Sequence, residues 1–310
     1  MRMRNGSGLF LRSKKILFQY HKGSMVTKYI ALCILCTFPC LHAEPSASMQ
    51  SFQIPSHGSD LNAFVYVAAG RGPHPLVILL HGFPGNERNL DLAQDIRRAG
   101  WDVLYFDYRG SWGTPGDFSF SHGMEDTAAA IQYVRSPAIA RILRLDTSRI
   151  VLIGHSLGGF MAVQAAAADP AVLGIALISA ADIGGRIPLL LSKHAEPVAL
   201  RGLTSGYDRE GMAPLNGCTP EGLAHETLNN AAQWRFLAKV SSLRSRPALI
   251  ITSNDAYARG DQAFASALRH AGNTRVATLH LSTDHVYSDQ REALSGALLR
   301  WLATVTSSSR

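Results

Sequence analysis

Apolar and polar residues alternate in blocks from about residue 50 onward, and these blocks predict strands and helices in turn. The run PLVILLHG at 75–82 is almost continuously apolar and rich in branched residues, which is typical of a strand buried on both faces. Residues 89–100 are amphipathic instead, and they end at Gly100, a residue type that often terminates helices. Further strands are predicted at 51–56, 61–69, 102–110, 149–156, 172–180, 247–255 and 274–281, and further helices at 124–136, 158–168, 259–271 and 288–303.

This alternation predicts an α/β fold with a mostly parallel sheet and helices on both faces. The two opening strands are predicted to form a hairpin at the edge of the sheet. One interval, residues 183–246, breaks the rhythm with about 60 residues between two strands. It leaves the sheet at the edge where ligands bind in such folds. We therefore predict that this insertion is a lid over the site, with a structural flap as the alternative.

The first 43 residues differ from the rest in charge and in hydropathy. They carry seven Lys or Arg and no acidic residue, and Lys28 precedes an apolar run of 13 residues that is followed by Leu-His-Ala43. This is the pattern of a secretory signal, and the run is shorter than the roughly 20 residues that cross a bilayer. We predict cleavage after Ala43, a secreted or periplasmic protein and no stable membrane insertion. Met1 and Met25 are both candidate starts, and a buried N-terminal helix is the alternative interpretation.

Charge and cysteine content limit what the remainder, residues 44–310, can do. The whole chain has 30 basic and 23 acidic residues, and removing the seven N-terminal basic residues leaves 23 of each, which is formally neutral. A nucleic-acid partner, which needs a basic surface, is therefore not expected. Cys218 is the single cysteine after residue 43, so neither an internal disulfide nor a cysteine-based metal site is expected there.

The strongest candidate for chemistry is Ser156, which lies in the sequence Gly154-His-Ser-Leu-Gly158 between a predicted strand and a predicted helix. A turn this tight requires small residues two positions before and two after the serine, and both positions are glycine. The turn would hold the hydroxyl clear of the sheet at the start of a helix, where peptide N–H groups stabilise an anion. Ser156 is therefore predicted to be a nucleophile, with a plain turn residue as the alternative.

A serine hydroxyl needs a base, and the base needs an acid to orient it. His285 follows the last predicted strand and is the predicted base, whereas His280 lies within that strand and is expected to be packed. Asp255 ends the strand at 247–255 and is the preferred acid. Asp261 and Asp182 are the alternatives, and Asp284, adjacent to the base, is expected to be solvated.

The sequence His81-Gly-Phe-Pro-Gly85 follows the buried strand at 75–82 and predicts an oxyanion site. Acyl transfer needs two preorganised donors for the developing negative charge. We predict that the backbone N–H groups of Phe83 and Leu157 supply them. His81 is assigned a structural hydrogen bond because it lies too early in the chain to be the base in this fold.

Between about residues 52 and 303, the segments HGFPG, DYRGSWGTPG, GHSLGG, SND and DH resemble the α/β-hydrolase superfamily in their order and spacing. The resemblance implies an eight-stranded sheet and a Ser–Asp–His hydrolase domain at 44–310. The segment DYRGSWGTPGDFSF is similar to the prolyl-oligopeptidase and dienelactone-hydrolase branches. In those proteins this loop lines the site, which implies that Trp112 touches the substrate. The alternative, which we favour, is that Asp107 and Arg109 brace the loop by a salt bridge.

These features predict an exported serine hydrolase that cleaves small carboxylic esters through an acyl-enzyme, without metal or organic cofactor. Amide cleavage by an aminopeptidase-like relative of this machinery is the first alternative, and it needs a carboxylate in the insertion to hold the substrate amine. A binding protein on an inactive hydrolase scaffold is the second. The physiological substrate and the oligomeric state are left open. The carboxylates of the insertion that could hold the amine of an amide substrate are Glu196, Glu210, Glu221 and Glu226.

Overall fold

The structure, a computed structural model, describes residues 44–307. The predicted signal sequence at 1–43 lies outside the described residues, so export and cleavage stay predictions. Within 44–307, none of the helices combines the length and the apolar character that a membrane crossing requires.

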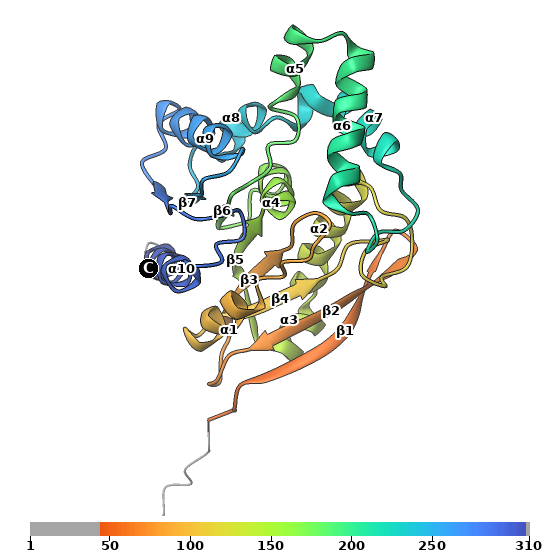
Figure 1. The fold of residues 1–310 in the computed structure, drawn as a ribbon. Helices are drawn as coiled ribbons and strands as arrows, with labels where there is room; N and C mark the ends of the chain where they lie inside the picture. Colours follow the sequence, from red (N-terminus) through yellow and green to blue (C-terminus); the bar gives the residue numbers. More distant parts are fainter. Residues whose placement is uncertain (1–43, 308–310) are drawn as a thin grey trace, which may run out of the picture. The chain divides into compact units, whose positions relative to one another are not determined.

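Eight strands form one sheet in the order β1-β2-β4-β3-β5-β6-β7-β8, which confirms the predicted fold class (Figure 1). Strand β2 is antiparallel to both of its neighbours, and the pairs from β4 through β8 are all parallel. The opening hairpin lies at one edge, as predicted. The strands are β1 (Ser48–Ser56), β2 (Ser59–Val67), β3 (His74–Leu80), β4 (Asp102–Phe106), β5 (Leu145–His155), β6 (Gly174–Ile178), β7 (Ala248–Thr252) and β8 (Val276–His280).

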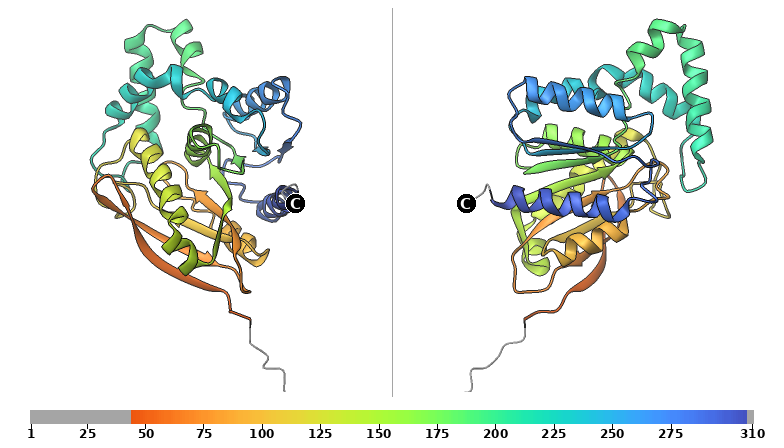
Figure 2. Two further views of the ribbon diagram at one scale, coloured as in Figure 1. Left: turned by 180° about the vertical axis from the view of Figure 1, so that it is seen from behind. Right: turned by 60° about the vertical axis from the view of Figure 1, so that its left-hand side comes forward.

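Helices cover both faces of the sheet (Figure 2). Side chains that alternate along a strand point to opposite faces, so Val77 and Leu79 of β3 pack in one apolar core while Ile78 and Leu80 pack in the other. The first core includes side chains from α1 (Leu90–Arg98) and α10 (Arg291–Ser307), and the second includes side chains from α2 (Phe120–Arg135), α3 (Pro137–Leu143), α4 (Leu157–Ala168) and α9 (Ala258–His270).

The insertion at 183–246 forms helices beyond the carboxyl ends of the parallel strands (Figure 1). Asp182 joins its two ends, because Oδ1 accepts hydrogen bonds from the N–H groups of Gly185 at 2.9 Å and Phe236 at 3.1 Å. Glu226 accepts hydrogen bonds from the first two N–H groups of α2, and these bonds attach the insertion to the rest of the domain at a second place. The elements are α5 (Ile187–Lys193), α6 (Glu196–Glu210), α7 (Pro220–Trp234), the 3₁₀ helix η1 (Phe236–Lys239) and α8 (Val240–Leu243).

Candidate active site

Ser156 occupies a strained turn between β5 and α4. Its backbone has φ 54° and ψ −118°, a combination that residues with a side chain rarely adopt. The turn closes tightly, because a Cβ on Gly158 would lie less than 3.0 Å from the carbonyl oxygen of Leu80. A Cβ on Gly154 would in turn meet the carbonyl of Gly158 at a similarly forbidden distance. The two glycines of the motif are therefore required by backbone packing, as the sequence indicated.

Gly158→Ala tests this packing. The added methyl group would collide with the backbone of β3, which cannot move without disturbing the centre of the sheet. We expect a loss of about 3 kcal/mol or more in unfolding free energy, in the range of severe steric substitutions. Urea unfolding monitored by circular dichroism measures it. Gly202→Ala on α6 is the control, because a Cβ there meets open space. Equal stabilities for the two variants would contradict the packing argument.

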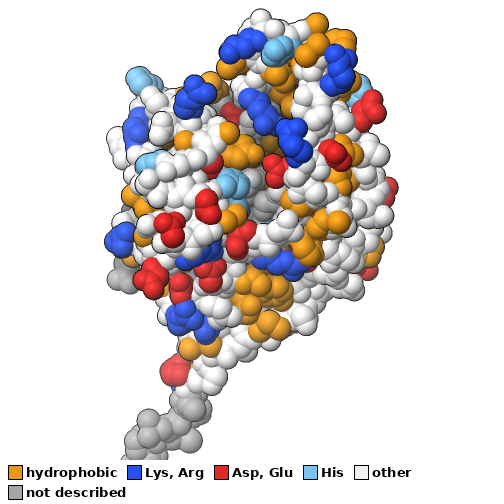
Figure 3. All heavy atoms as spheres, in the orientation of Figure 1, with side chains coloured by type: hydrophobic (Ala, Val, Ile, Leu, Met, Phe, Trp, Pro, Cys, Tyr) orange, Lys and Arg blue, Asp and Glu red, His pale blue; other side chains and the backbone are white. Residues whose placement is uncertain are grey.

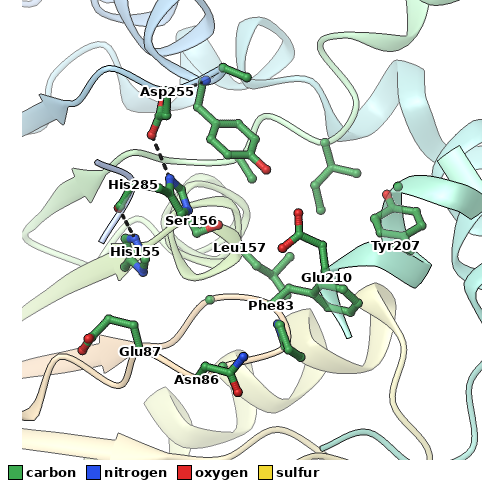
Figure 4. Close-up of a pocket in the computed structure, with 18 of the residues that line it drawn as sticks. Phe83, Asn86, Glu87, His155, Ser156, Leu157, Tyr207, Glu210, Asp255 and His285 are labelled. Atoms are coloured by element: carbon green, nitrogen blue, oxygen red, sulfur yellow. Dashed lines mark hydrogen bonds and ion pairs between the residues drawn. The ribbon is translucent and has the colours of Figure 1, made fainter. Parts of the chain in front are cut away.

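Ser156, Asp255 and His285 line one cavity of about 590 Å³ at the carboxyl edge of the sheet (Figure 4). They come from three separate segments: the β5–α4 turn, the loop after β7 and the loop after β8. His285 Nδ1 lies 2.8 Å from Asp255 Oδ2, so the acid and the base are already hydrogen-bonded. Because Nδ1 donates to the carboxylate, the other ring nitrogen is left available to accept a proton.

Asp255 is held in its charged form. Burial opposes ionisation, but hydrogen bonds from His285, from Ser179 and Ser253, and from the N–H of Tyr257 outweigh it and lower the pKa of Asp255 well below its ordinary value. The two alternative acids have other partners. Asp261 accepts from the N–H of Ala180, and burial raises its pKa.

Asp182 has a different environment again. Burial raises its pKa to about 6, although hydrogen bonds from the N–H groups of Phe236 and Gly185 oppose the rise. The hydrogen bonds of Asp182 hold the two ends of the insertion together, and none of them is made with His285. Of the three candidate acids, the structure therefore brings Asp255 to the base.

The predicted oxyanion donors also reach the cavity. Phe83 and Leu157 line it, and neither backbone N–H has an acceptor within residues 44–307. The N–H of Leu157 is open because it belongs to the first turn of α4, where no preceding helical carbonyl exists. The loop that carries Phe83 lies close to the serine, since a Cβ on Gly82 would lie 3.2 Å from Ser156 Cβ. Two N–H groups without an acceptor therefore belong to residues that line the same cavity as Ser156.

The cavity wall is aromatic on one side and charged at its rim. Phe83 packs against Tyr207 and Phe120, with ring centroids 5.7 and 6.0 Å apart. Figure 3 shows a hollow on this face with acidic and basic side chains around it. Tyr207 and Phe120 were not predicted, because the local sequence pattern does not show which of these side chains face the cavity. The charged lining residues besides Asp182, Asp255 and His285 are Glu87, Arg186, Arg209 and Glu210.

Comparisons with known proteins agree with this architecture. A family model described as the alpha/beta hydrolase fold matches residues 75–207. An esterase from Rhizomucor miehei is 18% identical with a TM-score of 0.62, and the alignment covers 86% of each chain. A hyperthermophilic esterase from Pyrobaculum calidifontis is 21% identical with a TM-score of 0.60, covering 86% of this chain and 87% of that one. The chain has the α/β-hydrolase fold.

The sequence relatives cover only part of this chain. An uncharacterized 31.7 kDa protein of the traX-finO intergenic region of Escherichia coli is 38% identical over 112 residues, which are 34% of this chain and 37% of that protein. The chain spans less than half of the length of the curated relatives that it matches. The likeness to the two esterases, at these identities, concerns the fold.

Trp112 does not have the role that the family resemblance implied. Its indole Nε1 donates to the carbonyl of Pro84 at 2.9 Å, and the guanidinium of Arg88 stacks 4.5 Å from its ring. It is absent from the lining of the cavity that holds Ser156. The expectation that Trp112 lines the site is therefore corrected: Trp112 supports the oxyanion loop, residues 81–85, through Pro84.

The predicted Asp107–Arg109 salt bridge is also wrong. Arg109 Nε pairs with Asp126 at 2.6 Å, and its other end pairs with Glu125, so both partners come from α2. Asp107 faces Arg88 at 3.7 Å instead. The side chains of residues 107 and 109 thus brace the loop separately, one toward Arg88, which follows the oxyanion loop, and one toward α2.

Of the two remaining histidine predictions, the one for His81 agrees with the structure and the one for His280 does not. His81 is buried and its Nδ1 donates to the carbonyl of Gly82 at 2.8 Å, and burial lowers its pKa to about 4, which fits the predicted structural role. His280 was expected to be packed but is exposed, because β8 is an edge strand. Asp284 is exposed and bonds the backbone and hydroxyl of Ser288. Among the described residues, no group of three or more His, Cys, Asp or Glu side chains could hold a metal ion.

Proposed function

We propose that the protein is a serine hydrolase that cleaves carboxylic esters through an acyl-enzyme. The observation that carries the proposal is the Asp255–His285 hydrogen bond at the rim of the cavity that Ser156 lines. An oriented base beside a strained serine at a helix N-terminus supplies the activation that a hydroxyl needs. An exported location, secreted or periplasmic, is proposed from residues 1–43 alone.

The reaction follows from the placement of these groups. Ser156 Oγ attacks the ester carbonyl while His285 takes its proton, and the N–H groups of Phe83 and Leu157 bind the oxyanion. The intermediate collapses as His285 returns the proton to the departing alcohol, which leaves an acyl-serine. Water, activated by the same imidazole, then adds to the acyl carbonyl, and the acid departs as Ser156 regains its proton.

A fluorophosphonate probe tests the chemistry directly, because it labels serine hydroxyls that are activated as nucleophiles. We expect stoichiometric labelling of residues 44–310, mapped to Ser156 by mass spectrometry, and protection by excess p-nitrophenyl butyrate. A protein that is folded but takes no label and turns over no ester would instead support the binding-protein alternative.

One observation favours amide substrates with a free amine as a second candidate. Of the four glutamates considered in the insertion, Glu210 lines the cavity, and Figure 4 shows its carboxylate directed into it. No ion pair of Glu210 occurs within residues 44–307. An unpaired carboxylate facing a reactive carbonyl could hold a substrate ammonium group.

Aminoacyl p-nitroanilides test this second candidate. If Glu210 holds the amine, Glu210→Gln should raise KM for these substrates by about tenfold or more, the scale of one lost charge contact. KM for p-nitrophenyl butyrate should not change. Glu221→Gln, at an exposed position of α7, is the control. Equal KM values for Glu210→Gln and wild type would remove this candidate.

A further inference from the structure

The base loop, residues 281–290, contains a tight turn centred on the catalytic base. The N–H of Tyr287 donates to the carbonyl of Asp284 at 3.2 Å, which closes a turn with His285 and Val286 as its two central residues. The carbonyls of the two central residues take no part in the closing hydrogen bond of such a turn. Both are therefore free to accept hydrogen bonds from donors elsewhere in the protein.

His155 supplies the first donor. Its Nε2 lies 2.9 Å from the carbonyl oxygen of His285 (Figure 4). Because only a protonated nitrogen can bond a carbonyl, Nε2 carries the proton. The side chain is buried, and its ring packs 4.7 Å from the ring of His285. Tyr257 packs on His285 as well, at 5.2 Å. His155 directly precedes Ser156, so one short segment carries both the nucleophile and an anchor for the base.

Arg291 supplies the second donor. Its Nη1 lies 3.0 Å from the carbonyl oxygen of Val286. The same guanidinium donates to Asn89 Oδ1 at 3.0 Å and forms an ion pair with Asp91. Arg291 begins α10, while Asn89 and Asp91 follow the oxyanion loop in sequence. The arginine therefore ties the base loop to the segment that continues from the oxyanion loop.

We propose that His155 and Arg291 form a carbonyl clamp, in which each binds one of the two consecutive carbonyls of the base loop and thereby fixes His285 toward Ser156. They are positioning residues, since neither takes part in proton transfer. The catalytic part of this inference rests on the proposed function, in which His285 is the base. The hydrogen bonds that hold the loop do not depend on it.

The clamp works without a charge at residue 155. Burial lowers the pKa of His155 to about 3 and the neighbouring His285 adds to this, although the hydrogen bond to the carbonyl of His285 opposes it. His155 therefore stays neutral through the range of an ordinary assay. A neutral ring can pack on His285 without repelling the positive charge that His285 gains during the reaction.

Substitutions can separate the donor from the ring. His155→Phe keeps an aromatic ring and loses the donor, whereas His155→Gln keeps a donor of similar reach. Arg291→Met removes the second anchor at a position outside the buried core. We expect His155→Phe and Arg291→Met each to lower kcat for p-nitrophenyl butyrate by about 10- to 100-fold with KM changed less than about threefold, since small misplacement of a reacting group has costs of this size. His155→Gln should recover most of the loss.

Amide hydrogen exchange of peptides from the base loop gives a readout that is independent of activity. We expect about tenfold faster exchange in His155→Phe and Arg291→Met, and wild-type exchange in the controls His225→Phe and Arg300→Met, which alter exposed side chains. Unchanged exchange in both clamp variants would overturn the clamp. Faster exchange with unchanged kcat would overturn the positioning role. If wild type turns over no ester, the proposed function fails, and the exchange data alone decide whether the clamp exists.

Discussion

Ser156→Ala is expected to reduce kcat/KM for p-nitrophenyl acetate and butyrate by about 10⁴-fold or more. The methyl group that remains cannot attack the ester, and no other side chain lies in the turn between β5 and α4. Residual turnover would come only from the oxyanion donors acting on water, which retain a small part of the rate enhancement. The measurement is initial-rate spectrophotometry of nitrophenolate release at matched protein concentration.

The variant should fold like the wild type, so the loss can be assigned to chemistry. Alanine and serine carry the same Cβ and therefore suffer similar strain at φ 54°. Melting temperatures from circular dichroism check this. Ser192→Ala, at an exposed serine in the insertion, is the matched control and should keep wild-type rates. Rates shared by wild type and Ser156→Ala would assign the hydrolysis to another group or to a contaminant.

The parts of this site that follow from sequence are those fixed by local rules. The run at 75–82 and the glycines around Ser156 specify a buried strand and a tight turn from nearest neighbours alone, and both are present. Asp255 and His285 were found because each lies at or just beyond the end of a predicted strand, and the carboxyl ends of parallel strands meet at one edge of the sheet.

The parts that could not be predicted depend on contacts between distant segments. Trp112 has no local signal that separates a cavity wall from a brace, because its partner, the carbonyl of Pro84, lies 28 residues away. The choice of Asp126 over Asp107 by Arg109 likewise depends on how α2 packs. The prediction for His280 was wrong because the sequence of a strand does not show its place in the sheet, and β8 lies at an edge. Helix α3 is too short to show a helical period.

The same distinction explains why His155 was passed over. In the sequence it is only the variable residue of the Gly154–Gly158 motif, a position that the turn leaves unconstrained. Its hydrogen bond to the carbonyl of His285 spans 130 residues. Only the folded arrangement shows that the nucleophile's neighbour also contacts the base.

Asp255→Asn is expected to lower kcat by about 10⁴-fold at pH 7. The substitution preserves shape, and the amide oxygen can still accept from the N–H groups of Tyr257 and Ala258, which bond Asp255 Oδ1 at 2.9 and 3.1 Å. The atom facing His285 Nδ1 would then be the amide nitrogen, a donor. His285 would respond by placing its proton on Nε2, and in that tautomer it cannot accept a proton from Ser156.

The pH dependence distinguishes this account from a general loss of structure. The pKa of Asp255 is lowered in the fold, so its negative charge is complete above the ordinary aspartate value near 3.9 and is lost only in strong acid. Titration of Asp255 should therefore not shape kcat between pH 5 and pH 9 in the wild type. Asp261→Asn is the matched control: that acid is buried and accepts from the N–H of Ala180 rather than from His285, so removing it should change kcat by less than about threefold. A large loss in Asp261→Asn with normal rates in Asp255→Asn would transfer the acid's role to Asp261, and the hydrogen bond at His285 Nδ1 would then have no catalytic part.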